Sequence, residues 1–73
     1  MIDLYIMENC PYCRKVMDFL DENHIDFNKN DISYPENHQR LLKLGGIDQV
    51  PFMVDGDTMM YESADIIEYL QKK

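Results

Sequence analysis

The sequence predicts an α/β fold in which a mixed four-stranded sheet is covered by helices on both faces. Segments that alternate between apolar and polar residues, as strands do, are interspersed with segments of helical periodicity. Their order is β-α-β-α-β-β-α. A strand–helix–strand start implies a parallel pair joined by a right-handed crossover. The two late strands are separated by a short turn, which makes them antiparallel and the sheet mixed.

The first strand is expected over residues 2–7, where "IDLYIM" alternates and is rich in β-forming residues. The periodicity then changes, because from Val16 onwards apolar residues recur at i, i+3 and i+4. Pro11 suits the first position of a helix, where a missing N–H costs nothing. These features predict an amphipathic helix over about 11–23.

The second strand and second helix follow in the middle of the chain. Alternation returns in "IDFNKNDI", which predicts a strand at about 26–30. A helix is expected over about 35–44, starting at Pro35 and containing three leucines. Gly45-Gly46 is predicted to end it, since glycine is common just past a helix C-terminus.

The last third of the sequence predicts a hairpin and a final helix. The runs "PFMV" and "TMMY" flank Asp55-Gly56, a strong signal for a short turn between antiparallel strands. Ser63 is a favourable N-cap for a helix over about 64–71.

Composition limits the classes of function. The chain has 73 residues, which predicts a single domain, and 45% of them are hydrophobic, enough for a core. Its formal net charge of −7 argues against binding to nucleic acid or to anionic membranes. The first ten residues lack the basic and long apolar regions of a signal peptide, so a cytoplasmic protein is expected. A monomer is also expected.

The two cysteines, Cys10 and Cys13, stand where the first helix is predicted to begin. A zinc site needs four ligands, and the two histidines, His24 and His38, have the wrong spacing, so no metal is expected. A structural disulfide that closes so short a loop would restrict the unfolded chain little. A redox centre explains the spacing, because residues three apart on a helix lie on the same side.

In the redox interpretation, Cys10 attacks a substrate disulfide and Cys13 resolves the mixed disulfide that forms. Thiol–disulfide exchange needs a thiolate, and an ordinary thiol is only a few per cent ionised at neutral pH. The dipole of a helix N-terminus contributes only about 1–2 kcal/mol toward the anion. Specific hydrogen bonds must therefore add to it, with the N–H groups of Tyr12 and Cys13 and the Cys13 thiol as candidate donors.

The motif "CPYC" after a first strand, together with the later "QVPFMVDGDTMMYES", resembles a glutaredoxin. The resemblance covers nearly the whole chain, in the family's order of elements, and implies one glutaredoxin-like domain over residues 1–73 with a thioredoxin-like fold. The stretch "VPFMVDGD…ESADIIEYL" is also similar to the N-terminal half of glutathione transferases, which share this fold.

The resemblance implies a role for each residue that matches the family's motifs. Cys10 would be the nucleophile and Cys13 the resolving thiol. Tyr12 would line a groove for glutathione. The backbone of Val50 would pair with the peptide part of glutathione, before a cis proline at Pro51.

The far end of the implied groove would hold the γ-glutamyl group. Ser63 and the N–H groups that open the last helix would bind its carboxylate, and Glu62 or Asp65 would meet its ammonium. Gln49 would donate hydrogen bonds. The expected groove residues are Tyr12, Gln49, Val50, Pro51, Glu62, Ser63 and Asp65.

Two positions depart from the family's pattern. Met7 stands where glutaredoxins often have a lysine, and the loop that contains Asp48 lacks the family's basic residue. Glutathione binding would therefore be weaker, or would use Lys15, Arg40 or Lys43 instead.

Three functions follow from this reasoning. The first is a dithiol disulfide oxidoreductase that reduces protein disulfides and glutathione mixed disulfides, with glutathione as co-substrate. The second is a redoxin of glutaredoxin sequence that is reduced by thioredoxin reductase. The third is a thioredoxin-fold module without catalytic activity that binds glutathione or an iron–sulfur cluster.

Overall fold

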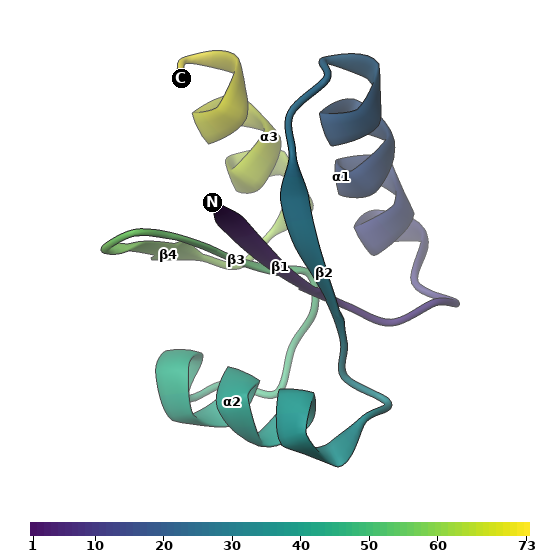
Figure 1. Ribbon diagram of the computed structural model, residues 1–73, viewed down its shortest axis with the longest axis vertical. Coiled ribbons are helices and arrows are strands. Elements are labelled where there is room, and N and C mark those ends of the chain that lie inside the picture. The colour runs from purple at the N-terminus through teal and green to yellow at the C-terminus, as the bar shows by residue number, and fades with distance from the viewer.

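The computed structural model describes all 73 residues and confirms the predicted order of elements (Figure 1). No bound differs from the predicted one by more than one residue, which is within the usual scatter at element ends. The elements are β1 (Ile2–Ile6), α1 (Pro11–Glu22), β2 (Phe27–Asp31), α2 (Pro35–Gly45), β3 (Phe52–Asp55), β4 (Thr58–Met60) and α3 (Ser63–Gln71).

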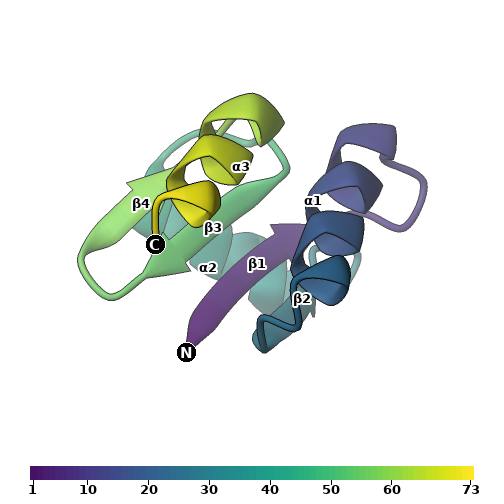
Figure 2. The same ribbon diagram turned by 90° about the horizontal axis from the view of Figure 1, so that it is seen from above.

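The sheet is mixed and has the strand order β2-β1-β3-β4. Strand β1 pairs in parallel with β2, with Ile2 opposite Phe27, and antiparallel with β3, with Leu4 opposite Met53. Strands β3 and β4 form the predicted hairpin. Helices α1 and α3 lie side by side on one face of the sheet, and α2 covers the other face (Figures 1 and 2). The fold is thioredoxin-like.

The alternation in β1 divides the core between the two faces of the sheet. Ile2, Leu4 and Ile6 point toward α1 and α3 and belong to the larger cluster of buried side chains. Tyr5 points the other way and packs with Leu41 of α2 and with a phenylalanine of β3. Each fully buried aliphatic side chain stabilises the fold by about 1.5–3 kcal/mol.

The start of α3 differs from the sequence prediction. Ser63 is the first helical residue and Glu62 is the N-cap, without a capping side-chain hydrogen bond. Glu62 has φ +62°, and its carbonyl oxygen accepts the hydrogen bond of the Ile66 N–H at 3.0 Å. Ser63 was therefore wrongly predicted as the cap, because the left-handed backbone of Glu62 starts the helix one residue earlier.

Asp55 at the hairpin turn makes the fold sensitive to acid. Its carboxylate Oδ2 lies 2.9 Å from Lys73 Nζ and accepts a hydrogen bond from the Tyr69 hydroxyl at 2.8 Å, and its side chain is only 17% exposed. Lys73, followed by Tyr69, holds the pKa of Asp55 below its ordinary value of 3.8. The stabilisation is thus present above pH 3.8 and is lost as the pH falls toward the folded-state pKa.

We expect Asp55→Asn to lower the free energy of unfolding at pH 7, because the charge-assisted contacts are lost. The difference from the wild type should shrink as the pH falls below 3.8, measured by thermal unfolding across the acid range. Asp57→Asn, at an exposed carboxylate in the same turn, is the matched control. An Asp55→Asn difference that stays constant with pH would contradict this account.

Candidate functional site

The two cysteines lie at the start of α1, at different depths. Cys10 is the N-cap, with an extended backbone at φ −95° and ψ 113°, and is half-buried. Cys13, in the first turn, is fully buried. The Cys13 N–H donates a hydrogen bond to Cys10 Sγ at 3.3 Å. The prediction that Cys13 lies deeper than Cys10 is confirmed.

The local backbone fixes Cys10 in this position. Its own N–H donates to the Met7 carbonyl at 3.2 Å, and its carbonyl accepts from the Arg14 N–H at 3.1 Å. Pro11 takes the first helical position, and the first turn contains no acidic residue. The Cys10 sulfur thus lies at the N-terminal end of the helix, the positive end of its dipole. Of the two backbone donors expected from the sequence, Cys13 makes the hydrogen bond and Tyr12 does not.

Cys13 is held as a neutral thiol. Burial, and then the neighbouring Cys10 sulfur, raise the pKa of Cys13 from 9.0 to about 12. Its side chain belongs to the same buried cluster as Val16 and Ile66, beneath α1 and α3. Of the two cysteines, only Cys10 is partly exposed to a dissolved disulfide.

Alkylation should report this difference in depth. We expect iodoacetamide at pH 7 to label Cys10 first, because the thiolate reacts and Cys13 is both buried and protonated. Cys13 should react at a comparable rate only after unfolding in denaturant. Peptide mapping after a short exposure measures the two rates, and preferential labelling of Cys13 in the folded protein would overturn the assignment.

A groove of about 570 Å³ is lined by Tyr12, a residue between the two cysteines in the motif, although neither cysteine lines it. Its walls come from the N-terminal turns of α1 and α3, and its base from the loop before β3. Six of the seven expected groove residues line it. The full lining is Tyr12, Lys15, Gln49, Val50, Pro51, Glu62, Ser63 and Ala64.

Asp65 does not belong to this groove. It lines a separate cavity of about 400 Å³ together with Met60 and Tyr69. The reason is helical phase, because Asp65 follows Ser63 by two positions and so lies roughly 200° further around α3. Of the two acidic residues expected near the groove, only Glu62 is there.

Lys15 is the one basic residue that lines the groove. Three cations were candidates from the sequence, and neither Arg40 nor Lys43 lines the groove. Lys15 follows Tyr12 by three positions on α1, so the two share one side of the helix. That spacing was the signal available in the sequence, but it does not say which side of α1 faces α3.

The base of the groove is formed where the loop before β3 meets α3. The Val50–Pro51 peptide bond is cis, as predicted, and Pro51 is buried. The Gln49 side-chain amide donates to Glu62 Oε1 at 2.9 Å. Gln49 is a hydrogen-bond donor as expected, and here it connects the base of the groove to one wall.

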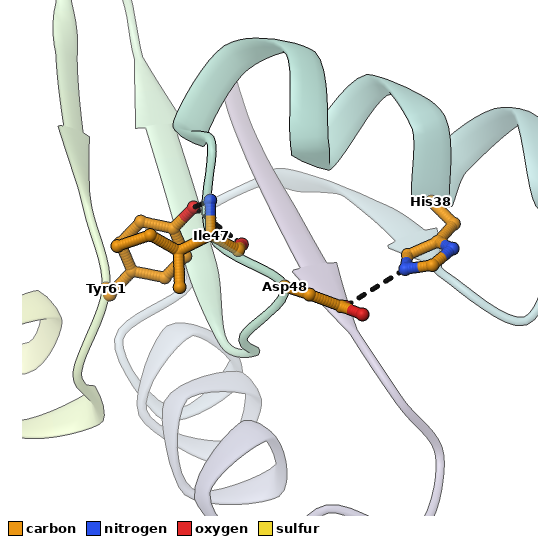
Figure 3. Close-up of polar contacts among 4 residues, drawn as sticks. All are labelled: His38, Ile47, Asp48 and Tyr61. Carbon is orange, nitrogen blue, oxygen red and sulfur yellow. Dashed lines mark hydrogen bonds and ion pairs between the residues drawn. The ribbon is translucent and has the colours of Figure 1, made fainter.

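Tyr61 and α2 fix the remainder of this loop (Figure 3). The Tyr61 hydroxyl accepts a hydrogen bond from the Ile47 N–H at 3.1 Å and donates one to the Ile47 carbonyl at 2.9 Å. His38 of α2 lies 3.0 Å from Asp48 Oδ1 in the same loop. Sequence reasoning gave no role to His38 or Tyr61, because neither contact has a motif.

No group of three or more His, Cys, Asp or Glu side chains is arranged to hold a metal ion. No helix has both the length and the apolar character needed to span a membrane.

Comparison with known proteins relates the chain to glutathione enzymes. The family described as "Glutathione S-transferase, N-terminal domain" matches residues 4–73. Dichloromethane dehalogenase from Methylophilus leisingeri is 38% identical over 68 residues, which cover 84% of this chain and 24% of that enzyme. The chain thus spans about a quarter of the length of this relative.

Solved structures show the same likeness. Human glutathione S-transferase T1-1 has a TM-score of 0.85 at 27% identity, covering 99% of this chain and 31% of that one. The thioredoxin-like protein BC3987 has a TM-score of 0.87 at 26% identity, and the match covers 99% of this chain and 97% of that one. A glutaredoxin from Archaeoglobus fulgidus shares the fold, with a TM-score of 0.79 at 22% identity. The match covers 96% of this chain and 85% of that one.

Proposed function

This chain belongs to the family of glutathione S-transferase N-terminal domains, and we propose that it is a dithiol disulfide oxidoreductase with glutathione as its reductant. One observation carries the proposal. The half-buried Cys10 sulfur accepts the Cys13 N–H at 3.3 Å, while the Cys13 thiol lies buried below it. This is the arrangement that an attacking thiol and a resolving thiol require.

On a glutathionylated protein, the reaction uses Cys10 alone. The Cys10 thiolate attacks the glutathionyl sulfur, the protein thiolate leaves, and a Cys10–glutathione disulfide forms. A second glutathione thiolate then attacks the glutathionyl sulfur. It releases the Cys10 thiolate and oxidised glutathione, so one free glutathione is consumed and the other half of the oxidised glutathione comes from the substrate.

On a protein disulfide, Cys13 is also needed. Cys10 attacks one substrate sulfur, the other leaves as a thiolate, and a mixed disulfide joins the two proteins. The thiolate that left accepts the proton of Cys13, and the Cys13 thiolate then attacks Cys10 Sγ. The substrate is released reduced, and two glutathione molecules reduce the Cys10–Cys13 disulfide. The high pKa of Cys13, about 12, keeps this thiol unreactive until the mixed disulfide forms.

The groove supports glutathione as the ligand. Tyr12 offers an exposed aromatic face beside Cys10, and the backbone of Val50 is available for strand-like pairing with a peptide. Ser63 and Ala64, the first residues of α3, line the end where a carboxylate would be favoured. These roles, for one glutaredoxin-like domain over residues 1–73, follow the family resemblance and are part of the proposal.

The family match favours a second candidate function. The dehalogenase relative is a longer protein, so residues 1–73 would be the glutathione-binding part of a transferase. In that case glutathione itself would be the nucleophile toward a small electrophile, and Cys13 would have no chemical role. Release of chloride from dichloromethane by the protein with glutathione, undiminished in Cys13→Ser, would favour this candidate.

The choice of electron donor tests the proposed function. The oxidised protein is incubated with glutathione, glutathione reductase and NADPH, or with thioredoxin reductase and NADPH, and appearance of the two free thiols is followed. Faster reduction by glutathione supports the proposal. Reduction by thioredoxin reductase alone would instead identify a redoxin of glutaredoxin sequence, and reduction by neither would end the redox interpretation.

A further inference from the structure

The groove contains one positive and one negative side chain. Lys15 on α1 provides the ammonium and Glu62, before α3, provides the carboxylate. Every other lining residue is uncharged. Because this groove lies in a protein of net charge −7, a cation there is the feature that most needs an explanation.

The two charges do not neutralise each other. The four ion pairs of the structure are Glu8–Lys29, His38–Asp48, Glu68–Lys72 and Asp55–Lys73, so Lys15 takes part in none. The partner of Glu62 is the neutral side-chain amide of Gln49, which donates a hydrogen bond to it. A cation and an anion that share a groove without pairing are complementary to a ligand that carries both charges.

We propose that Lys15 determines ligand specificity in this groove by pairing with a free carboxylate of a short zwitterionic thiol peptide. The inference rests on the proposed function, which supplies such a peptide as glutathione. Lys15 fits this role better than the other bases considered. Arg40 and Lys43 belong to α2, which covers the opposite face of the sheet, and neither lines the groove. Arg14, adjacent to Lys15 on α1, does not line it either.

The proposal is tested by binding, without any exchange reaction. The probe is S-methylglutathione, whose blocked sulfur cannot form a disulfide, and its Kd is measured by calorimetry. We expect Lys15→Gln to raise the Kd by about threefold to tenfold, the range for an exposed charge-assisted contact. Arg14→Gln is the matched control and should leave the Kd unchanged. The effect of Lys15→Gln should diminish at high ionic strength.

Two modified probes identify the carboxylate. One is the ethyl ester of the glycine carboxylate, and the other has 4-aminobutyrate in place of γ-glutamate and so lacks the α-carboxylate. The probe without the contacted carboxylate should bind the wild type more weakly, and Lys15→Gln should not weaken it further. Loss of Lys15 sensitivity with either probe supports the proposal and names the carboxylate.

The outcomes separate this inference from the proposed function. If Lys15→Gln binds S-methylglutathione as tightly as the wild type does, the proposed role of Lys15 is wrong. The same holds if Arg14→Gln weakens binding as much as Lys15→Gln does. Either result leaves the redox function intact. Sensitivity to Lys15 that persists with both modified probes also overturns it. Failure of the wild type to bind the probe overturns the inference, and the thiol-recovery assay then decides the proposed function by itself.

Discussion

Cys10→Ser is expected to reduce deglutathionylation to the uncatalysed rate, whereas Cys13→Ser should retain substantial activity. A serine hydroxyl at position 10 cannot act as the attacking thiolate or accept the glutathionyl group. Cys13 takes no part in that route, because a second glutathione releases the first. The assay uses a glutathionylated peptide with glutathione, glutathione reductase and NADPH.

Protein disulfides should show the opposite dependence on Cys13. Their mixed disulfide with Cys10 is resolved intramolecularly, and an external thiol does not match the effective concentration of a neighbouring side chain. Cys13→Ser should therefore be nearly inactive on a protein disulfide. If the wild type is active on the glutathionylated peptide and Cys13→Ser is as inactive as Cys10→Ser, the one-cysteine route is wrong.

Gly45→Ala is expected to destabilise the protein, although alanine is the better helix former. Gly45 is the last residue of α2, and a Cβ there would overlap the Tyr61 hydroxyl and lie 2.8 Å from ring atom Cζ. Tyr61 would have to move and lose both hydrogen bonds to Ile47, shown in Figure 3. Overpacking of this kind costs about 1–3 kcal/mol, more than the helix propensity gained.

A double-mutant cycle isolates the cause. In a Tyr61→Ala background the two closest atoms are absent, so adding Gly45→Ala should cost much less than in the wild type. Tyr61→Phe keeps the ring and removes only the hydroxyl, which should cost about 1–2 kcal/mol for the two hydrogen bonds. Denaturant unfolding measures all five proteins. A fully additive cycle would show that the Tyr61 contact is not what excludes a side chain at Gly45.

The fold was predictable because each element has a local signal. The alternation in β1, the proline at the start of α1 and the Asp55-Gly56 turn are each explained by neighbouring residues alone. The cysteine pair was predictable for the same reason, since the spacing from Cys10 to Cys13 is short enough for one helical turn to fix their relation.

The groove was predictable only in part, because it is assembled from three distant segments. The resemblance places Asp65 in the groove, but a rotation of roughly 200° around α3 from Ser63 puts it in a separate cavity. Lys15 was one of three candidates until the packing of α1 beside α3 selected it. The hydrogen bonds of Tyr61 depend on side-chain orientation across the hairpin, and no periodicity or motif encodes that.

The central claim is that Cys10 accepts a glutathionyl group, and intact-protein mass spectrometry of Cys13→Ser tests it most directly. The variant is incubated with oxidised glutathione, the excess is removed, and the adduct is located by peptide mapping. The account predicts one glutathionyl group per chain, on Cys10, that glutathione removes. An unmodified Cys13→Ser protein, under conditions in which a glutathionylated control peptide forms, would contradict it.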